Sequence, residues 1–174
     1  MILGIDHVGL LTADPEGVGA LLAVLGLSKV EGGVAGDYGV SCDFWQVGTD
    51  LAAPAVEVVA PVREDSAVAG RLARGPGLYH IAFEVDDLAA EAARLRASGF
   101  APVDAEPCRG ARAGMAVQYL YAPKPAGVLV ELVRYDTARR APMDAIRNSD
   151  EYAGETRLGN IASRPPAGNN YRTE

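Results

Sequence analysis

The chain has 174 residues, of which 49% are hydrophobic, and its formal net charge is −7. This length suits one domain or two small fused modules, and an acidic chain without a basic run is a poor partner for nucleic acid. No run of about 18 apolar residues occurs, so we expect no membrane span. The N-terminus lacks the basic segment followed by an apolar segment that is typical of secretion signals, so we expect no such signal. Two cysteines, Cys42 and Cys108, are too few for a disulfide framework, which favours a reduced, cytoplasmic setting.

The first half predicts a strand, a helix and three further strands. Residues 3–12 are apolar and stop at Asp14 and Pro15, which suit the cap and the first position of a helix. Gly26 ends this helix, because glycine tolerates the left-handed conformation that closes helices. The expected apolar face of the helix has four members at helical spacing: Val18, Leu21, Leu22 and Leu25. The three further strands are expected at 27–34, 38–47 and 55–61.

The second half predicts the same order of elements. A strand at 77–85 precedes a helix that Asp86 or Asp87 caps and Gly99 ends. Between the halves, residues 63–74 are polar and rich in alanine, which indicates a short connecting helix. Strands are then expected near 101–105, 115–122 and 127–134, with a hairpin turn at Lys124, Pro125, Ala126 and Gly127.

The two halves share chemistry-bearing residues at a constant spacing, which indicates an internal duplication. An offset of 73 residues relates three pairs: His7 and His80, Asp14 and Asp87, and Gly26 and Gly99. An offset of 74 relates Glu57 to Glu131 near the ends of the halves. We therefore expect two βαβββ modules at 1–62 and 76–135, a connector at 63–75 and an extension at 136–174.

Four repeat-matched polar residues point to a divalent metal ion. Strand alternation puts Ile5, His7 and Gly9 on one face, and it surrounds Glu57 and Glu131 with apolar neighbours. A buried carboxylate needs a positive partner, because an unpaired one costs several kcal/mol or changes its pKa strongly. The chain has only two histidines, and a divalent cation among two imidazoles and two carboxylates would satisfy all four groups. The alternative is that the histidines are structural and the glutamates pair with arginines such as Arg63 and Arg134.

The extension at 136–174 differs in character from the rest of the chain. It has few large apolar side chains and contains Pro165, Pro166, Asn169 and Asn170. A short helix is expected around 141–146, followed by an irregular tail. The extension either drapes over the surface or is disordered, or it forms an arm that covers the active site or embraces a partner subunit.

The sequence resembles the vicinal oxygen chelate superfamily, and within it the methylmalonyl-CoA epimerases more than glyoxalase I. Five segments carry the resemblance: Ile5–Val8, Val56–Pro61, Glu64–Gly70, Gly77–Asp87 and Gly127–Leu132. The resemblance implies an α+β fold in which the two modules form a cup-shaped, partly closed mixed sheet with helices outside. It also implies that His7, Glu57, His80 and Glu131 hold one metal ion inside the cup. The family's habit and an open sheet edge lead us to expect a homodimer.

The expected activity is removal of a proton next to a carbonyl, with the metal stabilising the enolate. Nitrogen and oxygen donors suit Co²⁺, Ni²⁺, Mn²⁺, Fe²⁺, Mg²⁺ or Zn²⁺. The base is Asp43, Cys42 or a ligand carboxylate such as Glu131, and these alternatives stay open. Some epimerases have a catalytic glutamate where this chain has Cys42, so the resemblance departs from the family there.

An acyl-CoA is the expected substrate, and cationic side chains are candidates for contact with it. We expect such contacts at Arg71, Arg74 and Lys124, with Arg109 and Arg112 as further candidates. Two other function classes stay open: another reaction on the same scaffold, such as a glyoxalase-type isomerase, lyase or dioxygenase, and a small-molecule-binding protein.

Overall fold

The structure, a computed structural model, describes residues 1–141 of the chain. The first half contains β1 (Ile2–Leu11), α1 (Pro15–Val24), β2 (Ser28–Ala35), β3 (Val40–Gln46) and β4 (Ala55–Pro61). The second half contains β5 (Gly77–Val85), α3 (Leu88–Ala97), β6 (Ala101–Pro102), β7 (Cys108–Arg109), β8 (Met115–Tyr121) and β9 (Leu129–Tyr135). A short helix, α2 (Ala69–Leu72), lies between the halves.

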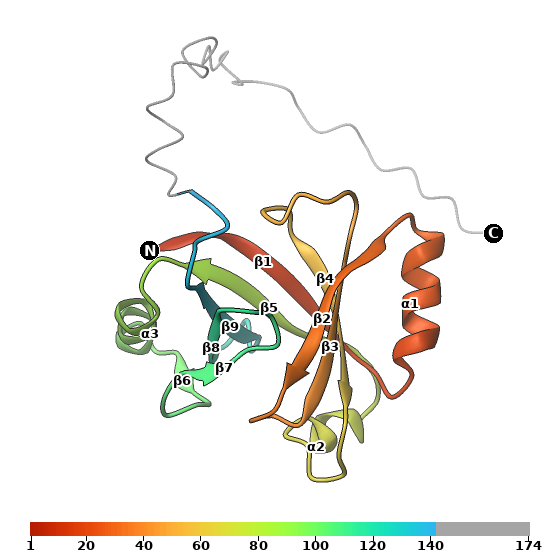
Figure 1. Ribbon diagram of the computed structural model, residues 1–174. Helices are drawn as coiled ribbons and strands as arrows, with labels where there is room; N and C mark the ends of the chain where they lie inside the picture. The colour runs from red at the N-terminus through yellow and green to blue at the C-terminus, as the bar shows by residue number, and fades with distance from the viewer. Residues whose placement is uncertain (142–174) are drawn as a thin grey trace, which may run out of the picture.

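One mixed sheet carries all of these strands, in the order β2-β3-β4-β1-β5-β9-β8-β6, with β7 paired to β8. Each half is built alike, because β1 runs parallel to β4 as β5 runs parallel to β9. The antiparallel pair β1 and β5 joins the halves (Figure 1). The outermost strands β2 and β6 do not pair in the described part of the chain, so the sheet is not closed into a barrel. The α+β fold built from two similar halves is confirmed, and the second half adds the two-residue strand β7 to the expected βαβββ order.

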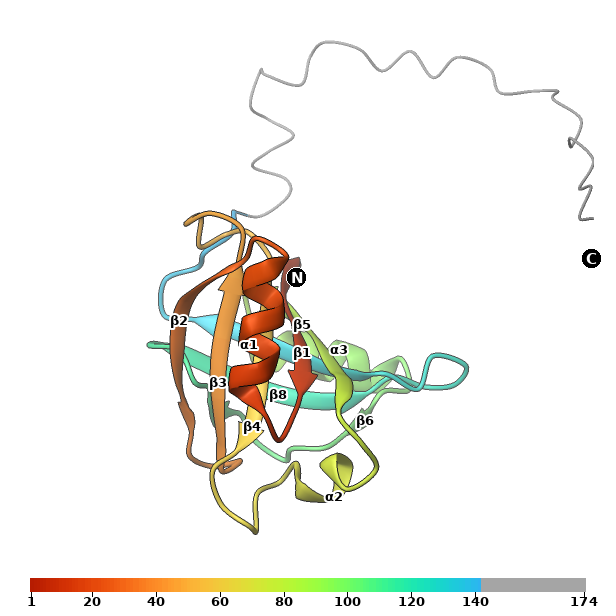
Figure 2. The ribbon, with the colours of Figure 1, turned by 90° about the vertical axis from the view of Figure 1, so that its right-hand side faces the viewer.

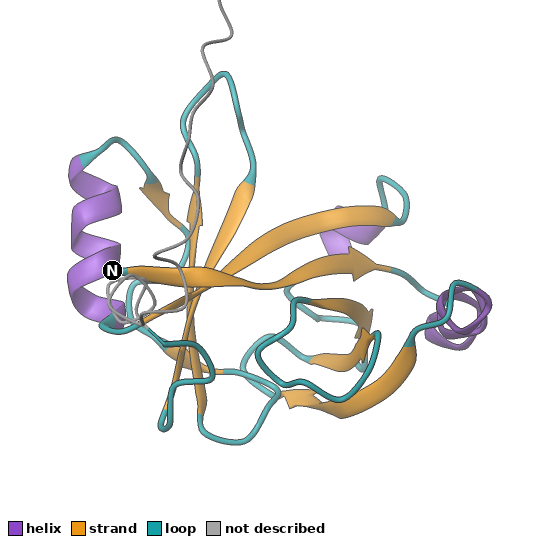
Figure 3. Ribbon diagram, turned by 90° about the horizontal axis from the view of Figure 1, so that it is seen from above, coloured by secondary structure: helices purple, strands orange, loops and turns teal. Residues whose placement is uncertain are grey.

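The two long helices pack on the outside of the sheet, one on each half (Figure 3). Helix α1 lies on the strands of the first half (Figure 2), where Gly19 makes room for the ring of Trp45. Helix α3 covers β8 and β9 through an apolar cluster: Val85, Leu88, Ala92, Leu95, Leu120, Val130 and Leu132. The inner face of the sheet is therefore left free to carry polar groups.

Helix boundaries follow the predicted caps. The Asp14 side chain accepts a hydrogen bond from the Gly17 amide at 2.9 Å, and Asp87 accepts one from Ala90 at 3.0 Å. Both bonds satisfy backbone donors that the first turn of a helix leaves without partners. The equivalent caps put both helices at the same place in their modules.

The predicted apolar face of α1 is only partly buried. Leu22 is buried as expected, whereas Leu21 is 59% and Leu25 66% exposed. The helix meets the sheet at Gly19 and Leu22, because the bulky Trp45 ring needs the space that a glycine leaves. The expectation that Leu21 and Leu25 face the core is therefore wrong.

The strand expected at 101–105 is reduced to the two residues of β6. Pro102 has no amide donor, and the Asp104 carboxylate accepts the backbone N–H of Tyr119 at 2.7 Å in place of a ladder carbonyl. The connecting helix is also shorter than expected, since α2 covers Ala69–Leu72 only. The hairpin turn at 124–127 is present and joins β8 to β9.

A bulge in β1 changes which residues face the inside of the cup. The pairing with β5 shifts register between Ile5 and His7, so the intervening Asp6 has no direct partner. Asp6 and His7 are consequently both buried, whereas Ile5 is 43% exposed. The expectation that Ile5 shares a face with His7 is wrong, because strict alternation stops at the bulge.

Within the described residues, none of the helices is both long and apolar enough to cross a membrane. The expected helix at 141–146 and the remaining tail fall almost entirely outside residues 1–141. We propose the division into 1–62, 63–75, 76–135 and 136–174 on the equivalent pairing of the halves.

Leu132→Ala is expected to lower the free energy of unfolding by about 2–5 kcal/mol, because Leu132 is fully buried beneath α3. Leu21→Ala is the matched control, and it should change that free energy by no more than about 0.5 kcal/mol, since this leucine is exposed. Urea unfolding of the two variants measures the difference. Equal losses would contradict the assigned core.

Candidate metal centre

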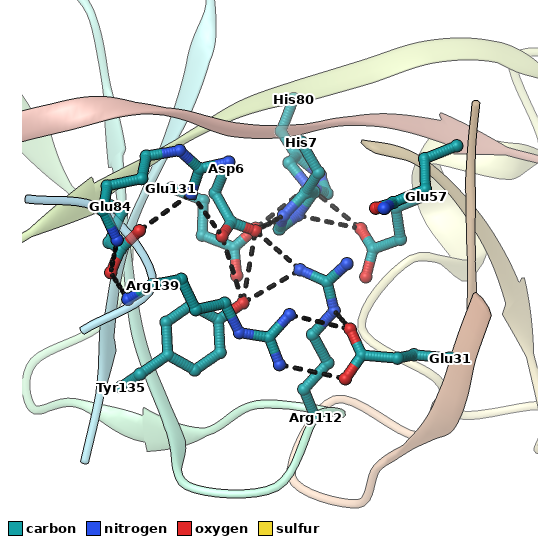
Figure 4. A network of polar contacts seen from close by, with 12 residues as sticks. Asp6, His7, Glu31, Glu57, His80, Glu84, Arg112, Glu131, Tyr135 and Arg139 are labelled. Carbon is teal, nitrogen blue, oxygen red and sulfur yellow. Dashed lines mark hydrogen bonds and ion pairs between the residues drawn. The ribbon is translucent and has the colours of Figure 1, made fainter. Parts of the chain in front are cut away.

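Four adjacent strands at the middle of the sheet bring the four repeat-matched residues together. They are His7 on β1, Glu57 on β4, His80 on β5 and Glu131 on β9. The register explains the meeting, because Gly9 lies opposite both Glu57 and His80, while Ala82 lies opposite both His7 and Glu131. All four side chains are buried and converge inside the cup (Figure 4).

The donor atoms of these residues lie very close to one another. His7 Nε2 lies 3.2 Å from Glu57 Oε2 and 3.0 Å from Glu131 Oε2. His80 Nε2 lies 3.1 Å and 2.9 Å from the same two oxygens. The two Nε2 atoms are 3.1 Å apart, and one donor atom from each residue lies within 4.8 Å of all the others.

This spacing fits a single divalent ion. Adjacent donors around an octahedral ion with bonds of about 2.1 Å are about 3.0 Å apart. The five distances above, from 2.9 to 3.2 Å, match that value. Glu57 Oε2 is also buried without a hydrogen bond of acceptable geometry among the described residues. A cation between these atoms would satisfy it, so the residues present fit a metal.

The charges of the centre favour a positive group at its middle. Burial by itself lowers the pKa of His7, but the charges of Glu57 and Glu131 raise that pKa well above its usual value. The pKa of His80 is raised by the same two carboxylates against the effect of burial. Burial raises the pKa of each glutamate, and the histidines outweigh it and lower that pKa. A divalent cation would supply the positive charge that both carboxylates attract.

Gly9 is required for the close approach of His80. A Cβ atom at position 9 would lie 2.3 Å from His80 Cε1 and 2.8 Å from its Nε2. Such contacts are impossible, so any side chain there would push the imidazole away from the centre. The repeat-matched position in β5 is Ala82, which lies opposite His7.

Asp6 fixes the orientation of His7, and sequence reasoning missed it. Asp6 Oδ1 lies 2.8 Å from His7 Nδ1, and a carboxylate can only accept, so the imidazole donates through Nδ1 and keeps the Nε2 lone pair for the centre. Burial raises the pKa of Asp6, but the hydrogen bond from His7 and the charges of His7, Arg112 and Arg140 lower it to about 2. Strict alternation pointed Asp6 outward, and only the bulge turns it inward.

His80 lacks an equivalent partner. Its Nδ1 atom is buried without a hydrogen bond in residues 1–141. The repeat-matched neighbour is Tyr79, whose ring meets the His80 ring edge-on at 5.1 Å between centroids. The two halves of the centre therefore differ in how firmly they hold their imidazoles.

A cavity of about 140 Å³ opens beside the two glutamates. Cys42 and Glu57 line it from the first half, and Tyr119 and Glu131 line it from the second. Most of the other lining groups are apolar, among them Val40, Val59, Met115, Val117 and Leu129. The centre thus borders a space that is small and mainly apolar.

Two of the three predicted candidates for the base lie in the cavity wall, and the third does not. Glu131 and Cys42 both line the cavity. Burial and the neighbouring Glu57 raise the pKa of the Cys42 thiol far above its ordinary value, so the thiol stays protonated near neutral pH. Asp43 is absent from the cavity wall and pairs with Lys29 at 2.7 Å.

Two further polar groups in the cavity wall were not predicted. The Tyr38 hydroxyl donates to Asp104 at 2.9 Å, and both residues line the cavity. No repeat relation singled them out, because Tyr38 belongs to a turn and Asp104 to an irregular loop. The break of the expected strand at Pro102 is the one sequence signal for this loop.

The predicted cationic contacts are divided between two regions. Arg71 and Arg74 line a surface hollow of about 410 Å³ that shares Tyr79 and Leu129 with the cavity. Lys124 lies in the exposed turn whose Gly127 borders the same hollow. Arg109 is exposed, whereas Arg112 is buried on the other side of the centre, 2.8 Å from Asp6.

Proteins similar to this chain in sequence and structure include methylmalonyl-CoA epimerases, which are enzymes. The ethylmalonyl-CoA/methylmalonyl-CoA epimerase of Cereibacter sphaeroides is 33% identical over 140 residues, which cover 76% of this chain and 98% of that protein. A Streptomyces coelicolor methylmalonyl-CoA epimerase variant in complex with 2-nitronate-propionyl-CoA superimposes with a TM-score of 0.70 at 32% identity, over 79% of this chain and 100% of that one. The Mycobacterium tuberculosis methylmalonyl-CoA epimerase gives a TM-score of 0.67 at 31% identity, over 83% and 93% of the chains.

The sequence profile of the Glyoxalase/Bleomycin resistance protein/Dioxygenase superfamily matches residues 6–119, well over half of the chain. This match covers His7, Glu57 and His80, and it agrees with the structural likeness to the epimerases. The chain therefore belongs to the Glyoxalase/Bleomycin resistance protein/Dioxygenase superfamily, with methylmalonyl-CoA epimerases among its relatives.

Proposed function

We propose that this protein is a metal-dependent epimerase of acyl-CoA thioesters that carry an acidic proton next to the carbonyl, such as methylmalonyl-CoA. The observation that carries the proposal is the convergence of His7, Glu57, His80 and Glu131 beside a small cavity. Relatives whose names state methylmalonyl-CoA epimerase support the choice of substrate.

The four converging residues would hold one divalent ion. When bound, this ion supplies charge stabilisation for the oxygen of a substrate carbonyl, which makes the neighbouring proton more acidic. Nitrogen and oxygen donors without sulfur admit Co²⁺, Ni²⁺, Mn²⁺, Fe²⁺, Mg²⁺ or Zn²⁺. The apolar cavity wall excludes water and strengthens every electrostatic interaction within it.

Inversion at carbon needs a proton acceptor on one face and a proton donor on the other. Glu131 lines the cavity from the second half, and Cys42 lines it from the first. We assign Glu131 as the base that removes the proton and Cys42 as the acid that returns one from the opposite side. The raised pKa of the thiol keeps its proton available for this step. Asp43, which pairs with Lys29 outside the cavity, is the less favoured base.

The hollow beside the cavity is the proposed place for the polar part of the acyl-CoA. Arg71 and Arg74 line it, and Lys124 lies in the neighbouring turn. Arginine pairs well with phosphate oxygens, which supports contacts with the phosphates of the coenzyme. Free thiols at Cys42 and Cys108 support a reducing, cytoplasmic setting, and a homodimer remains part of the proposal.

Proton exchange tests the reaction. The Co²⁺-supplied protein in deuterated solvent is expected to incorporate deuterium at the α-carbon of methylmalonyl-CoA and to interconvert the two epimers. Cys42→Ala should still exchange the proton of one epimer, but its interconversion should be slower by about 100-fold, since one of two acid–base groups is lost. Cys108→Ala is the matched control, because this cysteine does not line the cavity. Mass spectrometry and chiral separation give both rates.

The outcomes separate the competing functions. If the protein binds Co²⁺ but catalyses no exchange, the epimerase proposal fails in favour of another reaction, such as a glyoxalase-type isomerisation, a lyase step or ring cleavage. If it binds no metal, a small-molecule-binding role gains support. Loss of exchange in Asp43→Asn with full exchange in a Cys42 variant would make Asp43 the base.

Gly9→Ala is expected to weaken Co²⁺ binding by about ten-fold or more, because the new Cβ overlaps the His80 ring and displaces a ligand. Gly70→Ala is the matched control, since a Cβ there meets no atom within 4 Å. Isothermal titration with Co²⁺ compares the two variants. Equal affinities would show that His80 does not take part in the centre.

A further inference from the structure

The segment directly after β9 contacts charged side chains that do not line the cavity. We call residues 136–141 the C-terminal strap. The backbone N–H of Arg139 donates to Glu84 Oε1 at 2.6 Å, and the Arg139 guanidinium donates to both oxygens of Glu31 at 2.7 and 2.9 Å. Arg140 Nη1 contacts Glu84 Oε2 at 2.8 Å and Asp6 Oδ2 at 3.1 Å. The strap therefore joins β1, β2 and β5.

The strap completes a buried to half-buried network of charges that balances to zero. It holds three guanidinium groups and three carboxylates: Arg112, Arg139, Arg140, Asp6, Glu31 and Glu84. Glu84 is fully buried and Asp6 nearly so. Removal of one partner from a buried network leaves an uncompensated charge, so these contacts fix the geometry of the groups they join.

Asp6 is the point where this network meets the metal centre (Figure 4). Its Oδ1 atom accepts hydrogen bonds from His7 Nδ1 and Arg112 Nη1, each at 2.8 Å. Its Oδ2 atom accepts a hydrogen bond from Arg140 Nη1. The Tyr135 hydroxyl lies within hydrogen-bond distance of both oxygens, 3.2 Å from Oδ1 and 3.1 Å from Oδ2. Arg140 is the only guanidinium on Oδ2 in the described residues. The carboxylate plane, and with it the direction of the His7 ring, therefore depends on the strap.

We infer that Arg140 is a positioning residue for the metal centre: through Asp6 it holds the His7 imidazole with Nε2 aimed at the ion. This inference depends on the metal centre of the proposed function. Gly4 supports this inference, because a Cβ at that position would lie 3.0 Å from Arg140 Cδ. The absence of a side chain at Gly4 therefore gives the aliphatic part of Arg140 room to pack against β1. None of the residues in this network lines the cavity, so the effect on substrate contacts is indirect.

The sign of the effect separates positioning from plain electrostatics. Loss of a positive charge near a cation would by itself tighten metal binding. Loss of a group that orients a ligand weakens metal binding by about 10–100-fold, the usual effect of removing a hydrogen-bond partner of a ligating side chain. Weaker binding after removal of the Arg140 charge is therefore expected from positioning alone.

The test compares Co²⁺ affinity in the full-length protein and its variants by isothermal titration. Arg140→Met, which keeps the length of the stem, should bind about ten-fold more weakly than wild type, and Arg140→Lys should recover part of the loss. Arg94→Met is the matched control, since Arg94 is an ion-paired arginine on α3 outside this network. Unchanged or tighter binding by Arg140→Met would overturn the inference.

Two further measurements keep the test decisive. The chain has two histidines, so long-range proton–nitrogen NMR of the Zn²⁺-loaded protein gives few imidazole signals to assign. The signals of the His7 tautomer that carries its proton on Nδ1 should broaden or disappear in Arg140→Met. If that variant does not fold, Tyr135→Phe removes a milder contact with Asp6 and should weaken Co²⁺ binding a few-fold, whereas unchanged affinity would overturn the inference. Absence of Co²⁺ binding in the wild type would instead refute the proposed function.

Discussion

Two buried carboxylates and two buried imidazoles face one point inside this molecule, and their charges constrain the structure around them. Glu57 and Glu131 lie within 3.2 Å of both histidines, in a part of the sheet with very little solvent exposure. Such a cluster is stable only if positive charge is present at its middle, and a divalent ion supplies it with no change in the surrounding chain. The fold can be understood as the frame that keeps these groups together.

Duplication solves the problem of building that frame from distant parts of one chain. Parallel pairing of β1 with β4 and of β5 with β9 sets one glutamate beside the small residue of each central strand. The antiparallel contact of β1 with β5 then brings the two imidazoles within reach of both acids. The two halves differ more in their polar contacts than in their strands: within residues 1–141, His7 Nδ1 has a buried carboxylate as partner, whereas His80 Nδ1 has no hydrogen bond.

The sequence predicted most of the helices and strands and the four converging residues, because the internal repeat is visible at matching positions of the two halves. The caps at Asp14 and Asp87 depend on residues three positions away, and the spacing of the histidines is visible as a repeat in the sequence. Asp6 was not predictable, since the bulge that turns it inward comes from the pairing of Ile5 with Phe83 and of His7 with Ala82 on a distant strand. The partners of Asp6 come from a loop, a strand end and the strap, and no local pattern links Arg112 to Arg140.

The central claim is most directly tested by a crystal structure of the Co²⁺-loaded protein with anomalous diffraction at the cobalt edge. One strong anomalous peak is expected inside the cup, about 2.0–2.2 Å from His7 Nε2, His80 Nε2 and one carboxylate oxygen each of Glu57 and Glu131. A peak elsewhere in the molecule, or imidazole rings that turn away from both glutamates, would contradict it.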